Sequence, residues 1–359
     1  MVDAAALRAE FPVLDRVAYL NAGTQGPVPA RAAAAAQAEI ERECAEGRGG
    51  MPHFERLIGL GEELRGRVAG VFGCAADEVA LTGSTTDGMN AAIAATQLGP
   101  GDEVLTSDEE HPGLLAPLAA HRDRRGFEVR LAPFARIAEA IGPRTRLVAC
   151  SHVSWVNGQV VDTAALAASD ALVLLDGAQG LGAIPTPMDE LGCDFYGAAG
   201  QKWLCGPDGT GYLYVRRELA DELPVAWPSY MTLADSASPL ESAPRAGARR
   251  FDMGFSAPLW AWSLVALEVL DGAGLGAVQE RGPALAARLA DRLAGAGARV
   301  APRGRSTLVA WSSDDGAAEA RRLGEAGVLV REIPGRGLVR ASVGAWSGED
   351  DLERLLAAR

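Results

Sequence analysis

Short apolar runs alternate with stretches of helical composition between residues 75 and 215. The apolar runs are nearly continuous, which is typical of strands buried on both faces of a parallel sheet. We expect seven strands, at 78–83, 103–107, 128–133, 146–151, 171–176, 194–199 and 211–216. Helices are expected between several of them, for example at 87–97, 112–125 and 164–168. The alternation predicts an α/β fold with a mostly parallel sheet flanked by helices.

The C-terminal part of the chain shows a different pattern. Segment 219–249 is rich in Ala, Pro and Ser and is expected to be a long loop over the surface or over a partner subunit. Helices are then expected at 260–270, 279–293, 316–327 and 349–358, and strands at 306–312, 328–333 and 338–344. This pattern predicts a smaller α+β domain. We therefore expect an N-terminal segment (1–30) that packs with the small domain, a large domain (31–250) and a small C-terminal domain (251–359).

Charge and cysteine content exclude several classes of protein. The net charge is −13 and no basic stretch is present, which argues against nucleic acid or an anionic membrane as a partner. No apolar run reaches the roughly 18 residues that a transmembrane helix needs. The 5 cysteines are scattered and contain no CxxC pair, and no histidines and carboxylates have metal-ligand spacing. We expect a cytoplasmic enzyme without a metal site.

Lys202 is the only lysine in a chain that has 34 basic residues in total. It lies in GAAGQKWLCGPDGTG, between an apolar strand and a glycine-rich turn. Unlike arginine, lysine has an amine that loses its proton at accessible pH and forms a Schiff base with an aldehyde. Chance is the alternative explanation for one remaining lysine. Its position favours an imine-forming Lys202.

The sequence GSTTDGMNAAIAA (83–95) follows a strand and runs into a helix. The free N–H groups of a helix start attract a phosphate, and Thr85 and Thr86 can donate hydroxyl hydrogen bonds to it. An ordinary helix cap is the alternative. The stretch is not a P-loop or a dinucleotide fingerprint, because neither GK[ST] nor GxGxxG is present.

Three further charged or titratable residues lie at strand ends, helix starts or inside strands, where such groups are candidates for binding or catalysis. Asp176 ends an apolar strand and can pair with a protonated ring nitrogen or cap the next turn. His111 opens a helix and can stack on a flat ring, move protons, or lie in solvent. Arg340 lies in an apolar strand and can bind a substrate carboxylate or form an internal salt bridge. Together with Lys202 and the phosphate cradle, these residues match the needs of a pyridoxal 5′-phosphate enzyme.

From YLNAGTQGPVP (19–29) to VRASVGAWSGEDDLERLL (339–356) the chain resembles the class V aminotransferase and cysteine-desulfurase-like branch of fold-type-I pyridoxal-phosphate enzymes. Stretch 176–215 carries the most specific part of the resemblance. The resemblance implies a mixed, mostly parallel sheet, pyridoxal 5′-phosphate as cofactor, and a homodimer in which segment 250–256 reaches the neighbour's phosphate site. It also implies an amino-acid substrate.

Roles for single residues follow from the same resemblance. Lys202 would hold the cofactor as a Schiff base, and Asp176 would pair with its pyridine nitrogen. Gln179 would reach the phenolate oxygen, and His111 would stack on the ring and move protons. The remaining implied contacts are Thr85, Thr86 and Gln201 to the phosphate, and Arg340, Asn21 and Trp155 to the substrate.

The chain departs from the desulfurase pattern at four places, one of them Trp346-Ser347-Gly348 in place of Tyr-Asn-Thr after the carboxylate arginine. Ala199-Gly200-Gln201-Lys202 replaces Ser-x-His-Lys, which leaves Gln201 as a phosphate donor. Trp155 stands where desulfurases have asparagine, and Asn157 follows two residues later. No cysteine follows Cys205, which we expect to be a buried small hydrophobe. A desulfurase takes sulfur on a cysteine in its C-terminal part, so its absence here argues against that activity.

The favoured function is therefore that of a C–S lyase, which eliminates the sulfur group from a sulfur-substituted cysteine and gives pyruvate and ammonia. An aminotransferase, an epimerase and a kynureninase-like hydrolase remain as alternatives, because they use the same residues. A non-catalytic protein of the same fold is a further alternative. The presence of Lys202, Asp176 and Arg340 argues against it.

Overall fold

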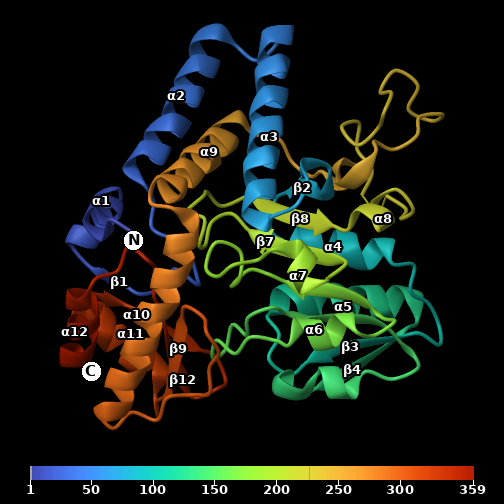
Figure 1. Cartoon of the computed structure of the whole chain (residues 1–359). Coiled ribbons are helices and arrows are strands. Elements are labelled where there is room, and N and C mark those ends of the chain that lie inside the picture. Colours follow the sequence, from blue (N-terminus) through green and yellow to red (C-terminus); the bar gives the residue numbers. More distant parts are fainter. Residues whose placement is uncertain (1, 226) are drawn as a thin grey trace.

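The computed structural model describes residues 2–225 and 227–359, and a seven-stranded sheet forms its larger part (Figure 1). The strand order is β2-β8-β7-β6-β5-β3-β4. The strands are β2 (Val79–Thr82), β3 (Glu103–Ser107), β4 (Glu128–Ala132), β5 (Thr145–Ser151), β6 (Leu172–Asp176), β7 (Phe195–Ala199) and β8 (Gly211–Val215). Strand β8 runs antiparallel to both of its neighbours, β2 and β7, and the other pairs of neighbouring strands are parallel. The predicted mostly parallel α/β sheet and its seven strands are confirmed.

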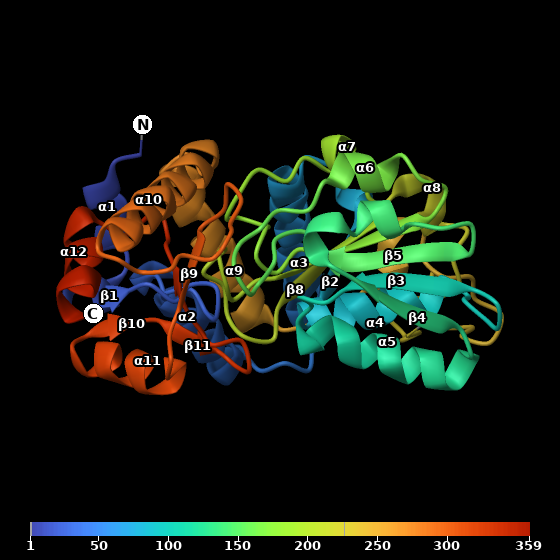
Figure 2. The same cartoon turned by 90° about the horizontal axis from the view of Figure 1, so that it is seen from below.

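Helices cover both faces of this sheet (Figure 2). In that view α4 (Thr85–Ala95) and α5 (Pro112–Arg125) lie below the strands, and α6 (Thr163–Ala167) and α7 (Met188–Leu191) lie above them. Strands β2, β3, β7 and β8 are buried along their whole length, which explains their continuous apolar sequences. Strand β4 is at the edge and is partly exposed.

A second group of elements surrounds a three-stranded antiparallel sheet of order β11-β12-β9. Its elements are β9 (Leu308–Ser312), β10 (Val328–Leu329), β11 (Arg331–Ile333), β12 (Leu338–Ser342), α10 (Leu275–Gly295), α11 (Gly316–Glu325) and α12 (Glu349–Ala358). The single strand expected at 328–333 is divided in two. The reason is that β10 pairs with β1 (Ala18–Tyr19), whereas β11 pairs with β12.

The N-terminal segment lies beside this C-terminal group, as the pairing of β1 with β10 requires (Figure 1). The remaining helices are α1 (Ala4–Ala9), α2 (Ala30–Glu46), α3 (Met51–Phe72), α8 (Arg217–Ala220) and α9 (Ala257–Gly272). Short 3-10 turns occupy Pro12–Asp15, Ala76–Glu78, Phe134–Arg136, Ala138–Ala140 and Gly247–Phe251. Helix α9 follows the boundary expected at residue 250 but packs against α2 and α3, which precede it. Contacts between helices therefore cross this boundary. The three-part division of the chain stays a prediction.

The loop expected at 219–249 is present. After α8, the described residues up to 246 form no helix or ladder strand. In the same described part of the chain, no single helix is long and apolar enough to cross a bilayer. Helices α9 and α10, bent by 77° to each other, have the required length and composition only when they are taken together.

Candidate active site

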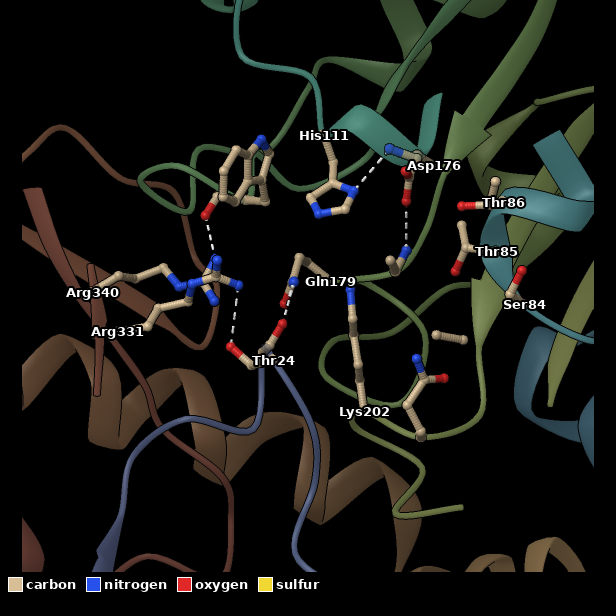
Figure 3. Close-up of a pocket in the computed structure, with 16 residues that line it drawn as sticks. Thr24, Ser84, Thr85, Thr86, His111, Asp176, Gln179, Lys202, Arg331 and Arg340 are labelled. Carbon is tan, nitrogen blue, oxygen red and sulfur yellow. Dashed lines mark hydrogen bonds between the residues drawn. The ribbon is translucent and has the colours of Figure 1, made fainter. Parts of the chain in front are cut away.

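A cavity of about 250 Å³ opens at the carboxyl ends of the parallel strands (Figure 3). Ligands bind at this edge in sheets of this kind. Nine of the ten side chains predicted for the site line it: Thr85, Thr86, His111, Trp155, Asp176, Gln179, Gln201, Lys202 and Arg340. The sequence signals therefore converge on one place, although their catalytic roles stay predictions.

Lys202 lies in the loop that follows β7, and its side chain is directed into the cavity (Figure 3). Burial lowers the pKa of its amine to about 8, and the nearby Asp176 partly opposes this shift. Burial favours the neutral amine because a charged group loses its hydration there. The neutral amine is the form that attacks an aldehyde or accepts a proton.

The N-terminal segment packs directly on the loop of this lysine. The amide of Gly26 donates a hydrogen bond to the carbonyl of Gln201 at 2.8 Å. A Cβ atom on Gly26 would lie 2.1 Å from the carbonyl oxygen of Lys202, so only glycine fits at this position. The segment thus fixes the backbone on which Lys202 stands.

Asp176 is the last residue of β6 and is 5% exposed. Its Oδ1 accepts a hydrogen bond from the amide of Ala178 at 2.9 Å. The turn-capping role that the sequence left open is therefore present, and the same carboxyl also lines the cavity. The two roles are compatible, because one carboxylate has lone pairs for more than one donor, and the pairing of Asp176 with a ring nitrogen stays a prediction.

His111 caps the start of α5, and its Nδ1 accepts a hydrogen bond from the amide of Gly113 at 3.0 Å (Figure 3). The neutral ring therefore carries its proton on Nε2. Burial lowers the pKa of the imidazole, and the charge of Lys202 lowers it further. His111 thus presents a neutral ring with one N–H donor beside the cavity.

The N-terminus of α4 forms the opposite wall, where Ser84, Thr85 and Thr86 face the cavity (Figure 3). Ser84 caps the helix by accepting from the amide of Asp87 at 3.1 Å. Within residues 2–225 and 227–359, the buried Thr85 Oγ1 and Gln201 Oε1 have no hydrogen-bond partner. A helix start with unpaired polar atoms beside it fits a bound phosphate.

Gln179 and Asn21 are engaged inside the protein. The Gln179 side chain donates to the carbonyl of Gly23 at 2.7 Å and accepts from the Trp203 indole at 3.1 Å. One N–H of its amide is left for a cofactor oxygen. Asn21 does not line the cavity, and its Oδ1 instead accepts from the Thr24 hydroxyl at 2.8 Å. Its contact with a substrate remains a prediction.

Two guanidinium groups, those of Arg331 and Arg340, point into the cavity side by side (Figure 3). Arg340 is fully buried, which lowers its pKa to about 9. Its Nη1 donates to the carbonyl of Trp155, while Nε and Nη2 have no partner among the described residues. The internal salt bridge considered for Arg340 is therefore not found in the described part of the chain. A carboxylate would satisfy the remaining donors.

The loop that carries Trp155 is held by an acidic side chain. Glu109 accepts from the hydroxyl of Ser154 and, at 3.1 Å, from the amide of Asn157. Asn157 thus binds Glu109. The indole of Trp155 packs edge-on against His111 and lies 5.7 Å below the Arg331 guanidinium.

Sequence reasoning missed seven residues of the cavity wall. They are Gly23, Thr24, Ser84, Gly113, Ala178, Ala199 and Arg331. The signal that singled out Arg340, an arginine inside an apolar strand, also applies to Arg331 in VLVREI. Thr24 gave no such signal, because its place depends on the pairing of residues far apart in the chain.

Several other expectations concern groups outside this wall. Segment 250–256 is tied internally, with Arg250 bound to Asp221 and Asp252 bound to Arg65, and its contact with a neighbour stays a prediction. Cys205 is buried, and burial raises its thiol pKa, as expected of a small hydrophobe. No group of three or more His, Cys, Asp or Glu in the described residues could hold a metal ion.

The residues present fit pyridoxal phosphate. The lysine can hold its aldehyde, the start of α4 its phosphate, and Asp176 its ring nitrogen. A cavity of this composition at the carboxyl edge of a mostly parallel sheet defines a fold-type-I pyridoxal-phosphate enzyme.

Comparison with known proteins gives the family. The aminotransferase class-V model matches residues 18–355. The chain is 30% identical to a probable cysteine desulfurase of Methanothermobacter thermautotrophicus over 60% of this chain and 57% of that protein. It is also 30% identical to isopenicillin N epimerase of Amycolatopsis lactamdurans over 78% of this chain and 75% of that protein. The chain belongs to the aminotransferase class-V family of pyridoxal-phosphate-dependent enzymes.

Solved structures agree with this assignment. A mutant of C-DES with glycine covalently linked to the PLP cofactor superimposes with a TM-score of 0.90 at 26% identity, over 98% of both chains. The complex of the cystine C–S lyase C-DES with its product cysteine persulfide also gives 0.90 at 26% identity, over 97% of this chain and 98% of that one. The alignments with the first two curated desulfurases span 57% and 58% of their length.

Proposed function

We propose that this protein is a C–S lyase that acts on sulfur-substituted cysteines by β-elimination. The observation that carries the proposal is the composition of the cavity wall. It combines the Lys202 amine with the free donors of Arg340, and no cysteine is among its described residues. A desulfurase needs a thiol that accepts sulfur, whereas an elimination needs a base, a carboxylate site and an electron sink. The likeness to the cystine C–S lyase C-DES supports the same choice.

Each residue has a task in this reaction. Bound pyridoxal phosphate supplies an aldehyde and an electron sink for the pair left at Cα. Arg340 binds the substrate carboxylate through its free Nε and Nη2. Lys202 removes the Cα proton, for which its lowered amine pKa of about 8 suits it. Asp176 provides the negative charge that keeps a ring nitrogen protonated.

The overall reaction balances with water as the second reactant. The Cβ–S bond breaks, its electron pair leaves with sulfur, and the sulfur group takes up a proton. One water is consumed as the three-carbon fragment becomes pyruvate and ammonia. Arg331, which donates to the Thr24 hydroxyl but has no carboxylate partner among the described residues, can meet an anionic group on the sulfur substituent.

An epimerase is the second candidate, supported by the likeness to isopenicillin N epimerase. It would use the same Lys202 base and return a proton to the other face of Cα. An aminotransferase and a kynureninase-like hydrolase would also begin at the same base. These reactions differ in their products, so product analysis separates them.

We propose in addition that the enzyme is a homodimer. Met51, Phe54 and Ile58 on α3 and Trp227 and Tyr230 in the loop after α8 are exposed, and they leave apolar surface uncovered in one chain. Sedimentation equilibrium at micromolar concentration tests the dimer. A monomer would contradict it.

The decisive experiment is product analysis with purified, cofactor-loaded protein. The panel contains cystine, S-alkyl cysteines, their sulfoxides and free cysteine. Pyruvate, ammonia and one sulfur product are expected in equal amounts: a persulfide from cystine, a thiol from S-alkyl cysteines, a sulfenic acid from the sulfoxides and hydrogen sulfide from cysteine. Lys202→Ala should give none. Retained substrate with inverted Cα would favour the epimerase instead. An active Lys202→Ala enzyme would contradict the proposed base.

A further inference from the structure

The turn Asp108–Glu109–Glu110–His111 contains a buried carboxyl that the reaction above does not use. Glu110 is 5% exposed and directly precedes His111. Its Oε1 accepts from the Ser107 hydroxyl. Its Oε2 accepts from the amide of Ser151 at 2.8 Å and from the Ser151 hydroxyl at 2.6 Å. Glu110 therefore joins the end of β3 to the end of β5 below the cavity.

Ser151 links this carboxyl to Asp176. The two residues are register partners on β5 and β6, and the next amide, that of His152, donates to the Asp176 carbonyl at 2.9 Å. Glu110 thus connects its chain neighbour His111 to Ser151, which lies beside the backbone of Asp176. His111 and Asp176 are the two groups expected on a cofactor ring.

The charges around Glu110 are unusual for a buried acid. Its hydrogen-bond partners are neutral, and no ion pair to it is found among residues 2–225 and 227–359. The titratable groups that face it from the neighbouring strands are Asp176 and the thiol of Cys150. Burial raises the pKa of Glu110 to about 7, and the charge of Asp176 adds to this shift. Two close buried carboxyls seldom ionise together.

We propose that Glu110 is a positioning residue: its buried carboxyl, held by Ser107 and Ser151, sets the local charge and geometry beside His111 and Asp176. Its hydrogen bonds tie the turn that carries His111 to Ser151, the register partner of Asp176. Below its pKa of about 7 the carboxyl is neutral and adds no negative charge beside Asp176. The inference concerns the family's cofactor chemistry and does not depend on which group leaves from the substrate.

Glu110→Gln is the decisive variant, because glutamine keeps the shape and one acceptor but never ionises. Above about pH 7 the wild-type carboxyl gains a charge, and a negative charge stabilises nearby cations. The pH midpoint of the cofactor's visible absorption band should therefore be lower in Glu110→Gln, by roughly half a unit or more. Below pH 6 the variant should keep kcat within about threefold, as expected for an already neutral group.

Asp108→Asn on the same turn is the matched control, since Asp108 is exposed, accepts from the amide of Phe134 and should leave the band midpoint unchanged. Glu110→Ala, which loses the hydrogen bonds, should lower kcat at every pH, and Glu110→Gln should restore it. An unchanged midpoint in Glu110→Gln would overturn the inference. So would a large loss of kcat in that variant at pH 6, because it would mean that the charged form is required.

These outcomes are separate from those of the lyase proposal. The band midpoint needs no substrate, and kcat can be measured for whichever reaction the product analysis finds. A protein that makes no pyruvate but shows the midpoint shift would keep the role of Glu110 and remove the lyase assignment. A protein that makes pyruvate but shows no midpoint shift would keep the lyase assignment and remove the role of Glu110.

Discussion

The indole of Trp155 meets the imidazole of His111 edge-on, with ring centroids 5.1 Å apart and planes at 87°. The two residues come from different strand ends of the sheet. Trp155 also accepts the only hydrogen bond of the Arg340 guanidinium found in the described residues. One loop therefore contacts both His111 and Arg340.

Removal of the Glu109 carboxyl should loosen this loop. Glu109→Ala loses hydrogen bonds to Ser154 and Asn157, each worth about 1 kcal/mol. We expect the free energy of unfolding to fall by about 1–3 kcal/mol and KM to rise more than kcat falls. Denaturant titration and steady-state kinetics measure the two effects. The same loss of stability with an unchanged KM would show that Glu109 does not position Trp155.

Loading of the cofactor should depend on the ionisation of Lys202. Burial lowers its amine pKa to about 8, and only the neutral amine attacks an aldehyde. The rate of pyridoxal phosphate binding to apoprotein should rise about tenfold per unit below pH 8 and then level off. Stopped-flow absorbance measures this rate. A plateau reached only near pH 10.5, the ordinary value, would contradict the lowered pKa.

Asp176→Asn tests the charge at the end of β6. The variant keeps the shape and an acceptor for the Ala178 amide, so the fold should be unchanged. Without the negative charge, kcat should fall by roughly 10²–10³, the range seen when one stabilising group of an active site is lost. Circular dichroism serves as the control for folding. A kcat within threefold of wild type would refute the role of Asp176.

The two arginines should differ in their effect on substrates. Arg340→Gln removes charged hydrogen bonds worth about 1.5–3 kcal/mol, so KM should rise roughly 10- to 150-fold for every amino acid tested. Arg331→Gln should raise KM for S-carboxymethylcysteine much more than for its neutral amide, S-carbamoylmethylcysteine. Arg305→Gln, at an exposed position, is the control. An equal effect of Arg331→Gln on both compounds would show that Arg331 does not bind the anionic group of the substrate.

Much of the fold follows from local pattern in the sequence. Continuous apolar runs such as LVLLD at β6 predict buried parallel strands, because both faces of such a strand lie against helices. Lys202, Asp176 and Arg340 are recognisable for a related reason. A charged group at the end of, or inside, an apolar run is costly to bury without a purpose. The rule that parallel strands end at one edge then brings Lys202 and Asp176 together, whereas Arg340 comes from the antiparallel sheet and reaches the cavity through tertiary packing.

Other features depended on the tertiary structure. Arg331, Thr24 and Trp155 share one cavity although they are far apart in the chain, and local pattern carries no information on such contacts. The division of 328–333 between two sheets was likewise set by its partners β1 and β12. The sequence by itself determined the strands of the large sheet and the family, and it singled out Lys202, which lines the cavity. Only packing decided which guanidinium groups stay free of carboxylates and that Glu110 is buried beside Asp176, because burial and charge pairing are properties of the assembled chain.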